Sequence, residues 1–318
     1  VAKRLSKGIE YLLKKNNIDY ISARGKLLGG STIITTDADG KEIKYKADKI
    51  IIATGARAKY FPNIKMDGDN IITYKEALVI DKQPKSLVII GAGAIGVEFA
   101  HFYHTFGTEV TLIEALPNIL PLEDADISKE LEKIFRKRKM NIQISTQVDK
   151  IEKFESSVKV HIRDGDIIEA DQVLVSIGVQ GNIEELGLEE CGISTENGWI
   201  KVNSFMETSQ PNVYAIGDVA GPPWLAHVAS AEGITAVEHL IGLNPEPMTY
   251  DNIPGCTYCQ PEVASVGLTE KAAREAGYKI KIGNFPFRSL GKSMAVGDTD
   301  GFVKVIYDAR YGEMLGCH

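Results

Sequence analysis

Apolar and polar positions along the chain follow two periods, which together predict an α/β protein. Continuous apolar runs are typical of parallel strands that are buried on both faces, and they occupy residues 49–55, 87–90, 109–113 and 172–177. Apolar residues at helical spacing mark residues 3–16, 94–106, 127–135, 226–241 and 269–276. Strands and helices alternate from Ser86 to Gly178, which predicts a βαβαβ arrangement around a parallel sheet.

Shorter alternating segments flank this region. Residues 20–25, 31–35 and 42–45 read as three short strands, and residues 148–170 read as a meander. After residue 245 the pattern is typical of an antiparallel sheet with one helix. In the helix at 94–106 we expect one apolar stripe, formed by Ile95, Phe99, Phe102 and Phe106.

A glycine motif joins the strand at 87–90 to the helix that follows it. Gly91, Gly93 and Gly96 have the spacing of a dinucleotide-binding turn. The first glycine permits the tight turn, the second lets the backbone approach a pyrophosphate, and the third lets helix and strand pack closely. The next strand ends at Glu114, 18 residues beyond Gly96, near the spacing of an acid that binds a ribose 2′-hydroxyl. An ordinary glycine-rich turn is the alternative, but strand, turn, helix and acid agree on a nucleotide site.

Composition narrows the classes of function. Of the 318 residues 44% are hydrophobic and 25% charged, and the net charge is −7. This acidic balance argues against nucleic acid as a partner, and no apolar stretch has the length of a membrane span. The four cysteines do not form a secreted disulfide framework, so we expect a cytoplasmic setting. Because the chain starts without Met in a helical pattern and ends within a strand, we expect a fragment.

Several motifs carry a resemblance to one enzyme family. They occur in the family's order at residues 51–55, 91–98, 176–178, 215–219, 225–227 and 261–267. With these motifs the chain resembles the dihydrolipoyl (lipoamide) dehydrogenases, which are class I pyridine nucleotide–disulfide oxidoreductases. The resemblance implies a flavin-dependent enzyme that transfers electrons between dihydrolipoamide, FAD and NAD. It also implies a homodimeric parent that acts on dihydrolipoamide held by a carrier domain of a 2-oxoacid dehydrogenase complex.

The resemblance further implies the fold class and the domain boundaries. We expect α/β, Rossmann-like FAD/NAD(P)-binding domains, three-layered with a parallel sheet plus β-meander, and a truncated α+β dimerisation domain. The expected domains are a partial FAD-binding domain at 1–80, an NAD-binding domain at 81–202, the continuation of the FAD-binding domain at 203–245 and a partial dimerisation domain at 246–318.

Cofactor roles follow from the resemblance residue by residue. NAD would be bound by Gly91, Ala92, Gly93, Ala94, Ile95, Gly96, Val97, Glu98, Glu114, Val148 and Gly178. In this set Glu98 would lie near the nicotinamide and the flavin, Glu114 would hold the adenosine ribose and Val148 would touch the adenine. FAD would be bordered by Gly25, Thr54, Gly55, Ala56, Asp218, Trp224, Leu225, Ala226 and His227. Because Glu114 would repel a 2′-phosphate and residues 115–118 contain no Arg, NAD is favoured over NADP.

Three parts of the family pattern are missing from these 318 residues. They are the N-terminal flavin-binding G-x-G-x-x-G, the redox-active C-x-x-x-x-C and the C-terminal His–Glu pair. We therefore expect no catalytic residue in the fragment and no activity on lipoamide from it. Two alternatives stay open: another disulfide reductase of the family, of the glutathione, mercuric or trypanothione type, or a non-catalytic NAD-binding module.

A cysteine pair and a histidine pair could each be a functional site or have only a structural role. Cys256 and Cys259 could form a redox or zinc site, but a strand follows them instead of a helix, which favours packing thiols. His101 and His104 could share a metal, but they lie opposite the expected apolar stripe, which favours exposure to solvent. We expect no metal site. Asp218 could be only a turn cap, although the preceding strand and Gly217 favour the flavin role.

Overall fold

The computed structural model describes residues 2–29, 31–61, 64 and 66–318. The chain divides into two compact units, residues 1–55 with 181–248 and residues 56–180 with 249–318. The four domain segments expected from the resemblance stay a prediction, because this division into two units does not test them.

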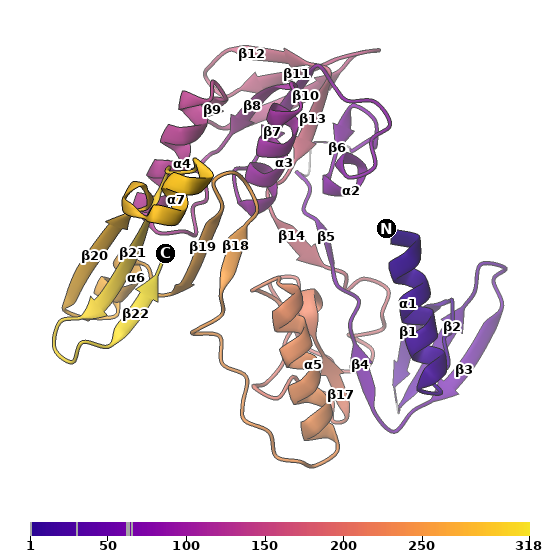
Figure 1. The fold of residues 1–318 in the computed structure, drawn as a ribbon. Coiled ribbons are helices and arrows are strands. Elements are labelled where there is room, and N and C mark those ends of the chain that lie inside the picture. The colour runs from indigo at the N-terminus through magenta and orange to yellow at the C-terminus, as the bar shows by residue number, and fades with distance from the viewer. Residues whose placement is uncertain (1, 30, 62–63, 65) are drawn as a thin grey trace. The chain divides into compact units, whose positions relative to one another are not determined.

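The second unit contains a five-stranded sheet in which every strand is parallel (Figure 1). Its order is β6 (Ile71–Ile72), β13 (Gln172–Val175), β7 (Ser86–Ile90), β8 (Glu109–Ile113) and β9 (Asn141–Gln143). Two helices connect the last three strands, α3 (Ala94–Thr105) between β7 and β8 and α4 (Ala125–Lys137) between β8 and β9. The short α2 (Tyr74–Ala77) follows β6. The βαβαβ prediction is confirmed.

Both faces of this sheet are buried because apolar residues occupy both sides of each strand. Leu87 and Ile89 of β7 belong to a core cluster shared with α3 and α4. Val88 and Ile90 point to the other face, where they pack with the meander. The meander consists of β10 (Val148–Lys153), β11 (Val158–Ile162) and β12 (Ile167–Ala170), which pair antiparallel. Helices, sheet and meander form the three layers expected from the sequence.

A second, antiparallel sheet completes this unit. Its order is β18 (Gly255–Thr257), β19 (Val263–Gly267), β22 (Met314–Cys317), β21 (Phe302–Asp308) and β20 (Ile280–Pro286). The smaller elements are α6 (Glu270–Glu275), η2 (Phe287–Ser289), α7 (Gly291–Val296) and the pair of β5 (Ala56–Ala58) with β14 (Val179–Gly181). Cys259 and Val263 join the core cluster of α3 and α4.

The first unit is built from smaller sheets. β1 (Arg24–Gly29), β2 (Thr32–Thr36) and β3 (Glu42–Lys46) form an antiparallel sheet, and β4 (Ile50–Ile52) pairs in parallel with β17 (Val213–Ala215). The remaining elements are α1 (Ala2–Lys15), β15 (Thr195–Glu196), β16 (Trp199–Ile200), η1 (Gly217–Ala220) and α5 (Ala226–Leu240). The strand expected at 20–25 begins only at Arg24, because its partner β2 ends at Thr36, where Asp37 starts a turn.

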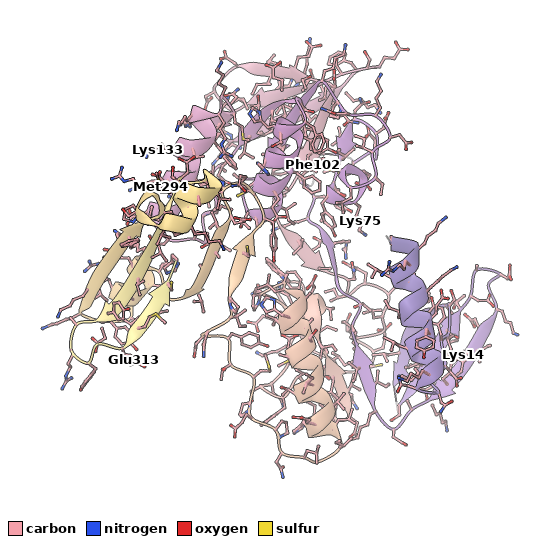
Figure 2. The ribbon with its side chains drawn as sticks, viewed as in Figure 1. Lys14, Lys75, Phe102, Lys133, Met294 and Glu313 are labelled. Atoms are coloured by element: carbon pink, nitrogen blue, oxygen red, sulfur yellow. The ribbon has the colours of Figure 1, made fainter. Side chains whose placement is uncertain are left out.

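The apolar stripe expected on α3 is wrong in its C-terminal half, although Phe99 packs against the core cluster. Phe102 is 51% exposed and Phe106 is 64% exposed, whereas Val97, Ala100 and Tyr103 are buried (Figure 2). Gly96 decides the phase, because a Cβ atom there would lie 1.9 Å from the carbonyl oxygen of Gly91. Gly96, Val97 and Ala100 are therefore buried together with Tyr103, whereas Phe102 and Phe106 point away from the core.

Candidate nucleotide-binding sites

The glycine turn after β7 is fixed by close backbone contacts. Gly91 has a φ of +99°, and a Cβ atom there would lie 2.5 Å from the carbonyl oxygen of Ser176. The Ser176 hydroxyl donates to the Gly91 carbonyl at 2.8 Å, and the Gly91 N–H donates to Ile113 at 2.8 Å. Gly91 and Gly96 therefore have no room for a side chain, as the motif predicts.

Gly93 lies in a different environment from the other two glycines. It is the N-cap residue of α3, and no side chain in the described part of the chain caps this terminus. A Cβ atom at Gly93 would meet no protein atom within 4 Å. A helix start carries unpaired N–H groups and a partial positive charge, so the open space in front of Gly93 fits a phosphate group.

Glu114 connects the end of β8 to this turn. Its Oε2 accepts the Ala92 N–H at 2.8 Å and its Oε1 accepts the Leu116 N–H at 2.8 Å, with 8% of the residue exposed. Each carboxylate oxygen can accept a further hydrogen bond, so ribose hydroxyls can still donate to it. Sequence spacing suggested the ribose role but not the bracing of the turn, which needs the three-dimensional contact.

Val148 and Gly178 lie beside the same edge of the parallel sheet. Gly178 follows β13 two residues after Ser176, has a φ of +111°, and a Cβ atom there would meet nothing within 4 Å. Val148 is half-buried at the start of β10, just after Thr146, whose N–H donates to the Glu114 carbonyl at 2.9 Å. Their expected contacts with NAD stay predictions.

Glu98 lies one turn inside α3, at the end of the run that begins at Gly91. Its Oε1 accepts the backbone N–H of Tyr258 at 2.7 Å. Tyr258 is 74% exposed in the turn between β18 and β19. The carboxylate thus joins the nucleotide helix to the C-terminal sheet, and its expected place beside the nicotinamide stays a prediction.

The first unit forms a second candidate site at the carboxyl ends of β4 and β17. These strands are parallel neighbours, and the Ile216 N–H donates to the Ile52 carbonyl at 3.0 Å. Gly55, after β4, has a φ of +70°, and Gly217, after β17, has a φ of +68°. Ligands in open α/β sheets bind outside such strand ends, so the two turns face the position expected for a cofactor.

Asn182 fixes the first of these turns, a role that the residue pattern did not reveal. The Thr54 hydroxyl donates to the Asn182 carbonyl at 2.8 Å, and the Asn182 side-chain amide donates to the Thr54 carbonyl at 2.9 Å. The Asn182 N–H also donates to the Gly55 carbonyl at 2.9 Å. Asn182, which is far along the chain, therefore fixes the conformation of Thr54 and Gly55.

Asp218, in η1, contributes a half-buried carboxyl group to the second site. It is half-buried, and burial raises the pKa of its carboxyl group. Within the described residues no hydrogen bond or ion pair compensates this burial. Beside it the buried Glu232 of α5 accepts the Gly217 N–H at 2.6 Å and fixes the turn, a role that the sequence pattern did not reveal. An unpaired, half-buried carboxylate fits the hydroxyl groups of a flavin's ribityl or ribose part.

The start of α5 supplies the remaining expected flavin residues. Leu225 is the N-cap residue, and no side chain in the described part of the chain caps this helix. Trp224 is 38% exposed and packs on Trp199, with ring centroids 5.2 Å apart. Ala226 and His227 are exposed in the first turn. The residues fit a flavin because the uncapped helix start favours negative charge on a bound ring.

Gly25 and Ala56, the last two residues expected to border the flavin, lie in strands. Gly25 is in β1 and pairs with Thr35 of β2. Ala56 begins β5, directly after Gly55. Their expected flavin contacts stay predictions.

The cysteine pair has the properties of packing thiols. Burial raises the pKa of Cys259 to about 12, and the thiol donates to the Pro261 carbonyl at 3.0 Å. Burial also raises the pKa of Cys256. Since reactive thiols need a lowered pKa, this pair is not built for redox chemistry. All four cysteines are free.

The histidine pair of α3 is occupied with other contacts. His101 stacks on Phe135, with ring centroids 6.4 Å apart, and His104 Nε2 lies 2.9 Å from the Arg138 carbonyl. Among the described residues no cluster of His, Cys, Asp and Glu has the arrangement of a metal site. None of the helices in this part of the chain is long and apolar enough to cross a membrane.

Comparison with known proteins agrees with this geometry. The family model "Pyridine nucleotide-disulphide oxidoreductase" matches residues 1–233, and the dimerisation domain of the same family matches residues 253–318. A dihydrolipoyl dehydrogenase from Zymomonas mobilis is 46% identical over all of this chain and 69% of its own length. One from Bacillus subtilis is 43% identical over all of this chain and 70% of its own length.

Solved structures show the same relationship. The crystal structure of LpdA from Mycobacterium tuberculosis superposes with a TM-score of 0.92 at 28% identity, covering 99% of this chain and 70% of that one. The flavoprotein disulfide reductase RclA from Escherichia coli reaches a TM-score of 0.88 at 27% identity, covering 99% of this chain and 74% of that one. The nucleotide turn, the layered fold and these similarities show that the chain belongs to the pyridine nucleotide–disulphide oxidoreductase family.

Proposed function

We propose that this chain carries the NAD- and FAD-binding parts of a dihydrolipoyl dehydrogenase. The observation that carries the proposal is the uncapped glycine turn of α3, which Glu114 braces through the Ala92 N–H at 2.8 Å. An acid that can accept hydrogen bonds from a ribose, beside backbone donors that suit a pyrophosphate, supports this proposal. The many relatives named dihydrolipoyl dehydrogenase favour this activity over a glutathione or mercuric reductase.

Each site contributes binding and orientation. When bound, FAD and NAD supply hydride transfer. The N–H groups at the start of α3 would hold the NAD pyrophosphate, and Glu114 would accept hydrogen bonds from the ribose. Asp218 would accept hydrogen bonds from the ribityl or ribose part of FAD, while Thr54 and Gly55 would border it. The start of α5 would favour negative charge on the flavin ring.

Nucleotide titration tests the NAD site. We expect NADH to quench the tryptophan fluorescence of the purified chain or to gain fluorescence itself on binding, and we expect NADPH to bind at least about tenfold more weakly. The reason is repulsion between Glu114 and a 2′-phosphate. Glu114→Gln should narrow the difference in affinity, because the neutral side chain no longer repels the 2′-phosphate of NADPH and holds the ribose of NADH less well. Equal affinity for the two nucleotides in the unaltered chain would contradict the assignment of Glu114.

The visible absorption spectrum tests the flavin site. Flavin bands in the purified chain, or after incubation with FAD and gel filtration, are the expected result if the turns at Gly55 and Gly217 suffice to hold the cofactor. A chain that stays colourless after incubation would limit its function to NAD binding. That outcome would favour the second candidate, a non-catalytic NAD-binding module.

The partners of the proposed enzyme follow from its family. The segment that matches the dimerisation domain supports a homodimer. Dihydrolipoamide on a carrier domain of a 2-oxoacid dehydrogenase complex would be the electron donor, and the four unpaired cysteines favour a cytoplasmic setting. Pull-down with a lipoylated carrier domain would test the carrier-domain partner, and the mass of the chain in solution would test the homodimer.

A further inference from the structure

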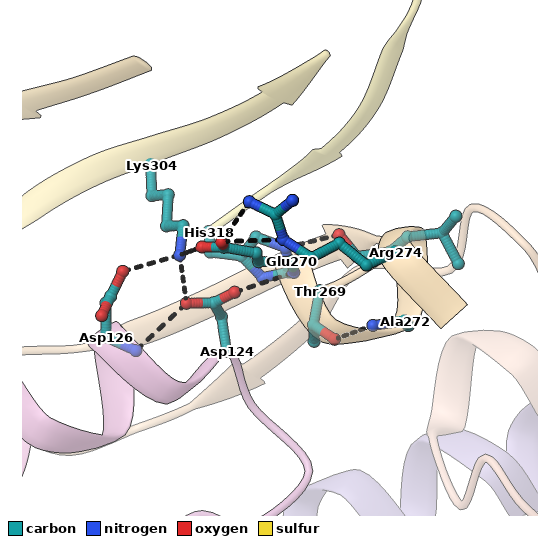
Figure 3. A network of polar contacts seen from close by, with 9 residues as sticks. Asp124, Asp126, Thr269, Glu270, Ala272, Arg274, Lys304 and His318 are labelled. Atoms are coloured by element: carbon teal, nitrogen blue, oxygen red, sulfur yellow. Dashed lines mark hydrogen bonds and ion pairs between the residues drawn. The ribbon is translucent and has the colours of Figure 1, made fainter. Parts of the chain in front are cut away.

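Lys304, in β21, carries a buried ammonium group that three carboxylates surround (Figure 3). Its Nζ lies 2.9 Å from Asp124 Oδ1, 2.6 Å from Asp126 Oδ2 and 2.8 Å from Glu270 Oε2. The side chains of Lys304 and Asp124 are each 2% exposed, whereas Asp126 is 47% exposed. The cluster therefore joins the start of α4 to the C-terminal sheet.

Opposite charges favour the ionised forms of Lys304 and Asp124. Burial alone would lower the pKa of Lys304, but its hydrogen bonds to Asp126, Glu270 and Asp124 raise it. Burial alone would raise the pKa of Asp124, but the Glu270 N–H and the Lys304 ammonium group lower it. Removal of one member from a buried ion cluster leaves the others uncompensated, so Asp124 depends on Lys304 for its position.

A short hydrogen-bonded path leads from Asp124 to the glycine turn. Asp124 is the N-cap residue of α4, and its carbonyl accepts the Ser128 N–H at 3.1 Å. The Ser128 hydroxyl donates to the Leu120 carbonyl at 3.0 Å. The Leu120 N–H in turn donates to the Ala92 carbonyl at 2.7 Å. Leu120 has a φ of +45°, a conformation that is strained for leucine and persists only where its surroundings fix it.

We propose that Lys304 is a positioning residue for the dinucleotide turn, acting on Ala92 through Asp124 and Leu120. The inference rests on the proposed NAD site and assigns part of its affinity to a residue of the C-terminal sheet. Ala92 is held on both sides, because Glu114 accepts its N–H and Leu120 donates to its carbonyl. Loss of the Lys304 cation releases Asp124, then the strained Leu120, and finally one of the two contacts that orient the turn.

The test measures NADH dissociation constants of the full chain and its variants well below their thermal midpoints. Lys304→Met keeps most of the length of the side chain without its charge, and Lys304→Arg restores a cation. The matched control is Lys133→Met on α4 (Figure 2), because Lys133 is 72% exposed and pairs with Glu130. We expect Lys304→Met to raise the dissociation constant about fivefold or more, Lys304→Arg to recover most of the affinity and Lys133→Met to leave it unchanged.

Amide hydrogen exchange supplies a readout that a general loss of stability would not reproduce. In Lys304→Met we expect faster exchange at Ala92 and Leu120 than in the unaltered chain, with little change at Val160 of β11, which lies in the other core cluster. If folded Lys304→Met binds NADH as well as Lys133→Met does, or if the two amides exchange unchanged, the inference is overturned.

Two further arms separate the possible failures. If the unaltered chain binds no NADH, the proposed function fails, while exchange at Ala92 and Leu120 still decides whether Lys304 orders the turn. If Lys304→Met does not fold, Asp126→Asn removes a half-exposed member of the cluster instead. We then expect an increase of about twofold in the NADH dissociation constant for Asp126→Asn. An unchanged constant would overturn the inference.

Discussion

Among single residues, the glycines of the α3 turn differ in what surrounds them. A Cβ atom at Gly96 would lie 1.9 Å from the Gly91 carbonyl oxygen, whereas one at Gly93 would meet nothing within 4 Å. The same residue type thus serves backbone packing in one position and, in our proposal, the approach of a ligand in the other. This difference separates stability from binding.

Alanine at each position tests that separation. Gly96→Ala should lower the free energy of unfolding by about 3 kcal/mol, because backbone must shift to admit the methyl group. Gly93→Ala should change it by less than about 1 kcal/mol and weaken NADH binding by about tenfold. Urea unfolding and fluorescence titration measure the two quantities. A Gly93→Ala chain with unaltered NADH affinity would show that no phosphate approaches this residue.

Asp218 predicts a conflict between stability and binding. Its raised pKa means that the folded chain holds the proton more tightly than the unfolded chain. Stability therefore falls as the pH rises from the ordinary value of 3.8 through the folded pKa, and the penalty persists at neutral pH. Asp218→Asn should raise the thermal midpoint at pH 7, lose that advantage in acid and bind FAD less well. A lower midpoint at pH 7 would contradict this account.

On the scale of elements, α4 depends on the buried carboxylate at its start. Asp124 caps the helix and pairs with Lys304. Asp124→Asn keeps the capping oxygen but removes the charge, so we expect a loss of about 3 kcal/mol in the free energy of unfolding. Because its pKa is lowered from 3.8, the contribution is complete above that value and disappears as the pH falls through the folded pKa. The urea midpoints of the unaltered chain and of Asp124→Asn should differ by the same amount from pH 8 to pH 5. A difference that disappears within this range would refute the lowered pKa of Asp124.

Sequence reasoning was most accurate for elements whose pattern is local. The parallel strands and the turn at Gly91 were predictable because apolar runs and glycine spacing are written in consecutive residues. The burial phase of α3 was not, since it depends on the contact between Gly96 and Gly91 that only the folded chain makes. Asn182 and Glu232 were missed for the same reason: each fixes a turn that lies far from it in sequence.

At the scale of the whole molecule, the chain carries the proposed binding sites without an identified redox pair. Its cysteines are Cys191, Cys256, Cys259 and Cys317, and no two are separated by four residues. Cys259, with a pKa raised to about 12, is a poor nucleophile. In the proposed enzyme, nucleotide binding and thiol chemistry thus depend on different residues.

This separation predicts the behaviour of the purified chain in an assay. We expect the 318-residue chain to bind NADH and yet not to reduce lipoamide with it, because no two cysteines have the spacing of the family's redox pair and burial raises the pKa of Cys256 and Cys259. The measurement is NADH oxidation in the presence of lipoamide and FAD, compared with FAD alone. Turnover above that blank would contradict the prediction and would direct attention to Cys256 and Cys259.

The buried position of Lys304 has a consequence for chemical labelling. Amine-reactive reagents modify lysines that solvent reaches, and this side chain is 2% exposed and bonded to three carboxylates. Its labelling rate in a mass-spectrometric footprint will therefore report how often the C-terminal sheet separates from the start of α4. Lys133, exposed on the same helix, supplies the internal reference. The labelling rate of one native amine thus measures how often this junction opens, and no engineered probe is needed.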